Sequence, residues 1–195
     1  MPDSLFQTLT AEANSAGITR RTIQARDWFI KRVRSITNVN RRQLLKDPVL
    51  ITKNRPLPGK MFMFVYDPKG KAELPYYDKF PLILMVGPAE GGFYGLNLHY
   101  LNPFMRAKFL DKLMQYASSK ELNENTKIRM SYQMLTAASK LKEFGPCFKH
   151  YLKDHIRSTI EMVPATEWDI ACFMPLEQFT KKDKNFVWKE SKSMI

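Results

Sequence analysis

Nine basic side chains crowd one short stretch near the amino end of the chain, and a single acid, Asp27, stands among them. Duplex DNA carries about one negative charge per 1.7 Å of its axis, so a dense cationic segment can bind its phosphates without reading its sequence. The alternative is a solvated helix face whose long basic side chains cover apolar surface. The residues predicted to contact nucleic acid are Arg20, Arg21, Arg26, Lys31, Arg32, Arg34, Arg41, Arg42 and Lys46.

Aromatic rings offer a second way to hold nucleic acid, because every base has a face on which a ring can stack. Rings on a small sheet more often fill its core and rim, and packing is the interpretation favoured for most of them. The rings with a possible stacking or contact role are Trp28, Tyr76, Tyr77 and Tyr100.

Carboxylates are the groups from which a catalytic site is most readily built. A metal-dependent nuclease gathers two or more acids around its metal ions. Asp67 and Asp78 fall in or beside expected turns, where aspartate is common for local hydrogen-bonding reasons. Glu167 and Asp169 share a face only if their segment is a strand. We therefore predict that the protein is not an enzyme, and a nuclease is kept as the second alternative. The full set of candidate acids is Asp67, Glu73, Asp78, Glu161, Glu167 and Asp169.

Histidine and cysteine spacing predicts no metal site and no nucleophile. His150 and His155 are five residues apart, so on a helix they diverge by roughly 140°. Residues 87–92, GPAEGG, lack the spacing and the lysine of a phosphate loop, and they indicate a hairpin turn. Cys147 and Cys172 stand beside apolar residues and outside any C-x-x-C pair, which indicates buried free thiols in a reducing compartment. We predict no cofactor and no metal.

The elements that must position these residues alternate between helices and short strands. Four residue ranges predict strands, the first three of them joined as an antiparallel meander: 60–71, 74–88, 91–102 and 158–164. Apolar spacing and capping residues predict helices over 4–15, 19–36, 103–119, 126–144 and 148–156. The expected fold class is α+β: a small antiparallel sheet, SH3-like or a partly open barrel, with flanking helices and an N-terminal basic helical arm.

The 195 residues suit one well-buried core. Prolines cluster near residues 48–58 and mark the expected end of the arm. The predicted organisation is a basic helical arm at 1–47, a globular α+β body at 58–180 and a polar C-terminal extension at 181–195.

The overall charge limits the class of partner. The formal net charge is +12, which favours a polyanion, with nucleic acid ahead of an acidic protein or a membrane surface. The first 17 residues lack the basic and then apolar pattern of a signal peptide. No stretch approaches the ~18 uninterrupted apolar residues of a membrane helix, so no membrane partner is expected.

Three blocks of sequence resemble small proteins of large contractile-tailed phages related to the T-even group, of the DNA end protector or head-completion type. The blocks are QARDWFIKRVRSI, then FVYDPKGKAELPYYDKFPLILMV with GGFYGLNLHYLNPFMRAKFLDKLM, and ATEWDIACFMPLEQFTKKDKNFVWKES. The resemblance implies a virion or assembly protein, found in the virion or the host cytoplasm. Its implied partners are DNA and other virion subunits, and assembly of identical copies into a ring is a further possibility. No role of a single residue follows from it.

The first hypothesis is therefore a virion-associated or head- or tail-completion protein that binds DNA non-specifically through its basic arm. The alternative is a purely structural tail, baseplate or neck component that contacts neighbouring subunits.

Overall fold

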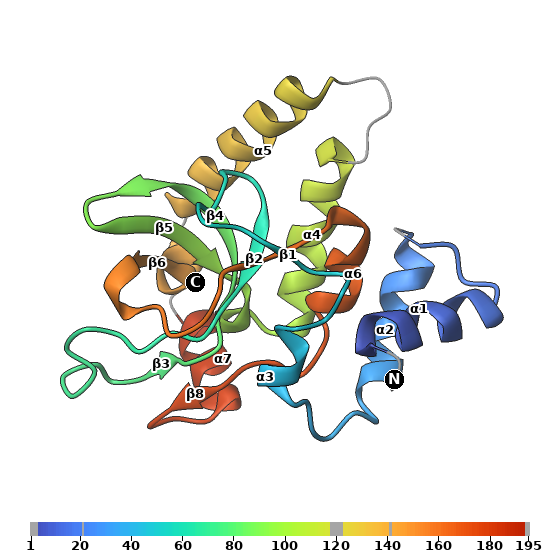
Figure 1. Ribbon diagram of the computed structural model, residues 1–195, viewed down its shortest axis with the longest axis horizontal. Helices are drawn as coiled ribbons and strands as arrows, with labels where there is room; N and C mark the ends of the chain where they lie inside the picture. Colours follow the sequence, from blue (N-terminus) through green and yellow to red (C-terminus); the bar gives the residue numbers. More distant parts are fainter. Residues whose placement is uncertain (1–3, 21, 118–122, 141, 194–195) are drawn as a thin grey trace.

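The computed structural model describes residues 4–20, 22–117, 123–140 and 142–193. Helices surround an open antiparallel sheet with the strand order β1-β7-β2-β4-β5-β6, and β3 pairs with β8 in a second, small sheet (Figure 1). The α+β class is thus confirmed, and the sheet does not close into a barrel over the residues described. The strands are Ile51–Thr52 (β1), Met61–Met63 (β2), Tyr77–Asp78 (β3), Leu82–Ala89 (β4), Gly92–Asn97 (β5), Phe148–Leu152 (β6), Glu161–Val163 (β7) and Phe179–Thr180 (β8).

The predicted meander is present as β2, β4 and β5, which are antiparallel neighbours in the sheet. The turn between β4 and β5 lies within the GPAEGG segment, as expected, and Gly91 takes a positive φ of 67° there. Gly92 follows, and a Cβ at this position would lie 1.9 Å from the carbonyl oxygen of Tyr151. Only glycine therefore allows β5 and β6 to approach this closely.

Residues 148–156 form a strand and a 3-10 turn, so the predicted helix in this segment is wrong. β6 pairs antiparallel with β5, from Leu96 opposite Phe148 to Gly92 opposite Leu152. The 3-10 turn then covers Lys153–His155. The free edge of β5 supplies backbone partners that a helix would not use, so tertiary pairing overrides the local helical spacing.

The N-terminal segment forms α1 (Leu5–Ser15), α2 (Ile23–Val33) and the short α3 (Arg41–Leu44). Ser4 caps α1, in agreement with the predicted start of the helix over 4–15, and Gln7 completes a capping box with it. Thr22 caps α2, which is shorter than the predicted 19–36. Phe6 and Phe29 are fully buried in the same apolar cluster as Leu84 of the sheet. The basic helices therefore pack into the main core, beside α6 (Trp168–Ala171) in Figure 1.

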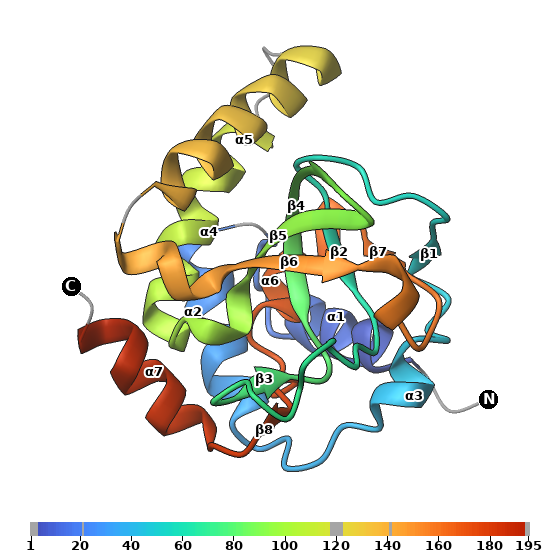
Figure 2. The same cartoon turned by 90° about the vertical axis from the view of Figure 1, so that its left-hand side faces the viewer.

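The predicted central helices are present as α4 (Pro103–Ala117) and α5 (Glu124–Ser139). They contact one another and extend beyond the sheet in Figure 2. Residues 118 and 119, also predicted as helix, lie outside the described residues. None of the described helices has the length and apolar character that crossing a bilayer requires.

Within the predicted polar C-terminal extension, residues Lys184–Ser193 form a further helix, α7. Val187 is fully buried, and the Trp188 indole donates a 2.9 Å hydrogen bond to the carbonyl oxygen of His99. This helix docks on the chain's own body. The division at residues 47, 58 and 181 stays a prediction.

Candidate nucleic-acid interface

Arg20 is bound inside the molecule rather than presented to solvent. Its Nη2 lies 2.7 Å from Asp169 Oδ1 and 3.2 Å from Glu167, and its Nε donates to Asp169 Oδ2 at 3.1 Å. Burial alone would lower the pKa of Arg20, but the bonds and charges of the two acids raise it. The guanidinium thus stays charged and is neutralised by the protein's own carboxylates.

Three more of the predicted contact arginines have internal acceptors. Arg26 forms an ion pair with Asp111 of α4. Arg32 pairs with Glu12 of α1, with Nη2 to Oε1 at 2.8 Å. Arg41 donates to the backbone carbonyl oxygens of residues 175–177, the nearest at 2.8 Å. Arg26 and Arg41 join the N-terminal segment to the body, whereas Arg32 joins α2 to α1. The donors of all three are at least partly used.

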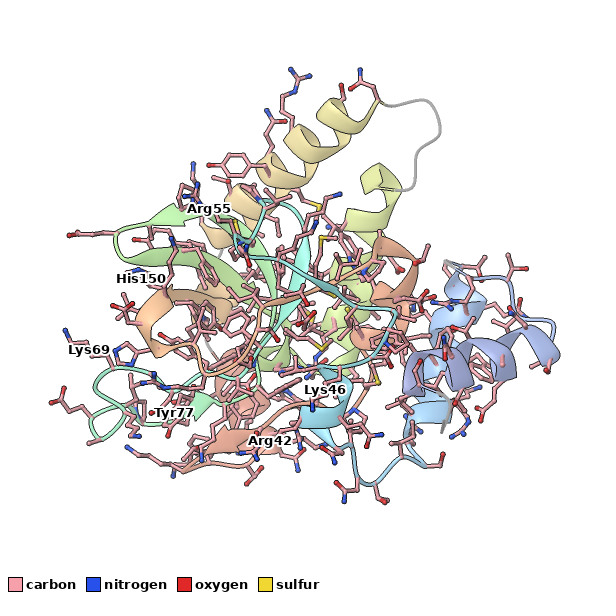
Figure 3. The ribbon with its side chains drawn as sticks, in the orientation of Figure 1. Arg42, Lys46, Arg55, Lys69, Tyr77 and His150 are labelled. Carbon is pink, nitrogen blue, oxygen red and sulfur yellow. The ribbon has the colours of Figure 1, made fainter. Side chains whose placement is uncertain are left out.

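Four of the predicted basic residues are exposed: Lys31, Arg34, Arg42 and Lys46. In the part of the chain that the structure describes, none of them forms an ion pair. We call these four the exposed cation group. Arg42 and Lys46 lie at α3 (Figure 3). Arg21, also predicted, lies outside the described residues.

The predicted aromatic contacts are largely occupied by packing. Trp28 is half-buried, with its ring edge-on to Phe29 at a centroid distance of 5.0 Å. Tyr77 and Tyr100 are buried, and the half-buried Tyr76 lies 6.0 Å from the Tyr100 ring. Burial raises the pKa of both Tyr76 and Tyr100 well above the ordinary tyrosine value.

The candidate nuclease acids do not gather into one site. Asp67 is paired with Lys71 at 2.9 Å, and Glu161 accepts from Thr52 at 3.0 Å. Glu167 and Asp169 lie in a 3-10 turn and in α6, not in a strand, and both bind Arg20. The residues described contain no cluster of three or more histidine, cysteine or acidic side chains able to hold a metal ion.

A cleft that the sequence did not predict lies between residues 66–78 and β6. Its volume is about 230 Å³. Three of its residues, Lys69, Tyr77 and His150, lie along one edge of the molecule in Figure 3. The side chains that matter most for its chemistry are Lys69, Tyr76, Tyr77, Tyr100, Lys149 and His150.

Asp78 and its donors form the buried floor of this cleft. Asp78 Oδ2 lies 2.7 Å from His99 Nδ1, and Asn97 donates to the same oxygen at 3.1 Å. Asn97 also donates to the Tyr151 hydroxyl at 3.1 Å. Burial alone would raise the pKa of Asp78, but the charge and hydrogen bond of His99, with the other donors, hold it below the ordinary value. The carboxylate is therefore charged and fixed in place.

Lys149 places an amine in the cleft beside an aromatic ring and without an acidic partner among the described residues. Its Nζ lies 4.4 Å from the centroid of the Tyr100 ring, and among the described residues it forms no ion pair. Burial lowers the pKa of this amine. In a strand, Lys149 and Tyr151 lie on the same face because side chains alternate between the two faces. Alternation along residues 148–152 could therefore have predicted their proximity, but the segment was interpreted as a helix.

Comparison with known families gives a match over nearly the whole chain. The family model described as Phage T4 terminal DNA protecting protein matches residues 3–193, which span both the exposed cation group and the cleft. No curated protein and no solved structure matches the chain.

Proposed function

Because this chain belongs to the family of the phage T4 terminal DNA protecting protein, we propose that it binds the ends of linear phage DNA and shields them from attack. The single observation that carries this proposal is the family match over residues 3–193. The role is that of a bound cap. A protein seated on the terminal base pairs excludes an exonuclease by occupying its substrate, and no reaction of its own is needed.

The contact with DNA is made through phosphate and without sequence preference. The net charge of +12 attracts a polyanion from any direction. The exposed cation group supplies side chains that are not neutralised by the described acids, whereas Arg20, Arg26, Arg32 and Arg41 hold the fold together. Phosphate contacts position a protein on a duplex but carry no sequence information. Binding without sequence preference suits a protein that recognises the end of a DNA duplex, whatever its base sequence. It would act in the virion and in the host cytoplasm.

Protection from digestion tests the proposal directly. A blunt linear duplex is incubated with the protein and then with an exonuclease that degrades from duplex ends. We expect the linear DNA to persist, and an unlabelled linear competitor to remove the protection more effectively than covalently closed circular DNA of the same sequence. An endonuclease that cuts internal sites is the control, and its rate should change little. Equal affinity for linear and circular DNA, with no protection, would contradict the proposal.

A further inference from the structure

We propose that the cleft between residues 66–78 and β6 binds the terminal phosphate monoester of a DNA strand, with Lys149 and Lys69 as its cationic ligands. This inference rests on the proposed function, and it names the chemical group by which the protein distinguishes an end. Internal phosphates are diesters. A phosphate monoester carries about −1.5 to −2 charges at pH 7 and three acceptor oxygens.

Lys149 is the first observation that points to an anion. An ammonium withdrawn from water is costly unless it is paired and hydrogen-bonded, and no described acid pairs with this one. The Tyr100 ring lies 4.4 Å from its Nζ and compensates only in part. A phosphate in the cleft would supply the missing counter-charge, and the low dielectric of the site would strengthen that attraction.

The rest of the lining favours a phosphate over a cation. Lys69 is exposed at the opposite wall, on the segment that precedes β3, and His150 lies on β6 with its Nε2 2.9 Å from the carbonyl oxygen of Glu90. Figure 3 shows Lys69 and His150 at the same edge of the molecule. Lys69 and Lys149 stand on the two elements that bracket the cleft, so an anion that enters between them meets a lysine from each wall.

Among the described residues that line the cleft, Asp78 is the one carboxylate, and its oxygens are already engaged. His99 and Asn97 bind Oδ2, and the backbone N–H groups of Phe80 and Gln178 donate to Oδ1 at 3.0 and 3.1 Å. The acid is thus compensated by its own partners and does not neutralise Lys149. Asp78 and Asn97, which both line the cleft, are almost fully buried, so the cleft reaches into the interior at these residues. A terminal group fits such a place better than a continuous strand.

Four DNA molecules of one sequence test the proposal: blunt duplexes that end in a 5′-phosphate, in a 3′-phosphate or in hydroxyl groups, and a covalently closed circle. We expect the wild-type protein to bind either the 5′-phosphate duplex or the 3′-phosphate duplex at least about tenfold more tightly than the hydroxyl duplex. A tenfold change in Kd corresponds to the contribution of one hydrogen bond to a charged group. Lys149→Gln should remove this preference. Lys153→Gln, an exposed lysine just after β6 and outside the cleft lining, removes the same charge and should keep it.

Each outcome decides the question. If the wild-type protein binds phosphorylated and hydroxyl ends equally, the cleft proposal is overturned. If it still binds both kinds of end more tightly than the circle, the proposed binding of DNA ends stands. Loss of the preference for ends over the circle overturns both. Because Lys149 is half-buried, thermal melting of Lys149→Gln is measured first. If that variant does not fold, Lys69→Gln at the exposed wall decides, and an unchanged phosphate preference in it counts against the cleft.

Discussion

Arg20 and Asp169 stand 149 positions apart in the chain and are joined by a two-pronged ion pair, with Nε to Oδ2 at 3.1 Å and Nη2 to Oδ1 at 2.7 Å. The planar guanidinium fork matches the carboxylate in this geometry. The pair fastens the segment between α1 and α2 to α6. Part of the cationic charge near the amino end therefore stabilises the fold.

Substitution of Arg20 should accordingly weaken folding. Arg20→Ala removes the cation that balances Glu167 and Asp169, whose side chains are 13% and 4% exposed. Breaking one side of such a pair is expected to cost about 3 kcal/mol in the free energy of unfolding, measured by urea titration. Arg42→Ala is the matched control, because an exposed arginine should stay within about 0.5 kcal/mol of wild type. Similar stability of the two variants would show that the ion pair contributes little.

The exposed cation group should determine the salt dependence of DNA binding. The double variant Arg42→Gln with Lys46→Gln removes two charges at α3. If both residues contact phosphate, the slope of log Kd against log salt concentration should fall by about 2. Lys112→Gln with Lys189→Gln removes the same charge from exposed positions on α4 and α7 and should leave the slope near that of wild type. An unchanged slope in the α3 variant would place the DNA elsewhere.

The sequence predicted the elements whose signals are local. Ser4, at the start of the predicted helix over 4–15, indicated the start of α1, and the GPAEGG segment indicated the β4–β5 turn, because caps and turns depend on a few adjacent residues. The buried free thiols, Cys147 and Cys172, were also predicted correctly. The resemblance to T-even-like end protectors is confirmed by the family match.

Features that depend on distant partners were not predictable in the same way. β6 exists because the edge of β5 accepts it, and nothing within residues 148–156 records that edge. The same error hid the cleft, since a helix would have sent Lys149 and Tyr151 in different directions. The acids that bind Arg20 and the carbonyl groups that bind Arg41 lie 134 or more residues away. Charge density alone does not show which arginines find such partners.

The buried pair of Arg106 and Glu177 should make stability depend on pH. The two side chains are 1% and 5% exposed and lie 2.9 Å apart. Burial alone would raise the pKa of Glu177, but the charges of Arg106, His99 and Lys184, together with a backbone hydrogen bond, hold this pKa below the ordinary value. A depressed carboxyl pKa stabilises the fold above the unfolded-state value of about 4.3, and this contribution is lost as pH falls through the lower folded-state pKa.

Glu177→Gln tests this dependence. The variant leaves Arg106 buried without its counter-charge, so we expect a loss of about 3–5 kcal/mol in the free energy of unfolding at pH 7. As the pH falls below about 5, the free energy of unfolding of the variant should also decrease less steeply than that of wild type. Urea titration at each pH measures this. Parallel pH profiles for the two proteins would mean that other carboxylates cause the acid dependence.

The two cysteines should report on the integrity of the core. Burial raises the pKa of Cys147 and Cys172 to about 12 each, and the thiolate is the form that reacts. A disulfide reagent at pH 8 should therefore leave both thiols unmodified in the native protein and modify both after denaturation. The unfolded-state thiols ionise near pH 8.5 while the folded ones stay neutral, so stability should decline as pH rises past that value. Rapid modification of either cysteine under native conditions would show that the core opens on the time scale of the assay.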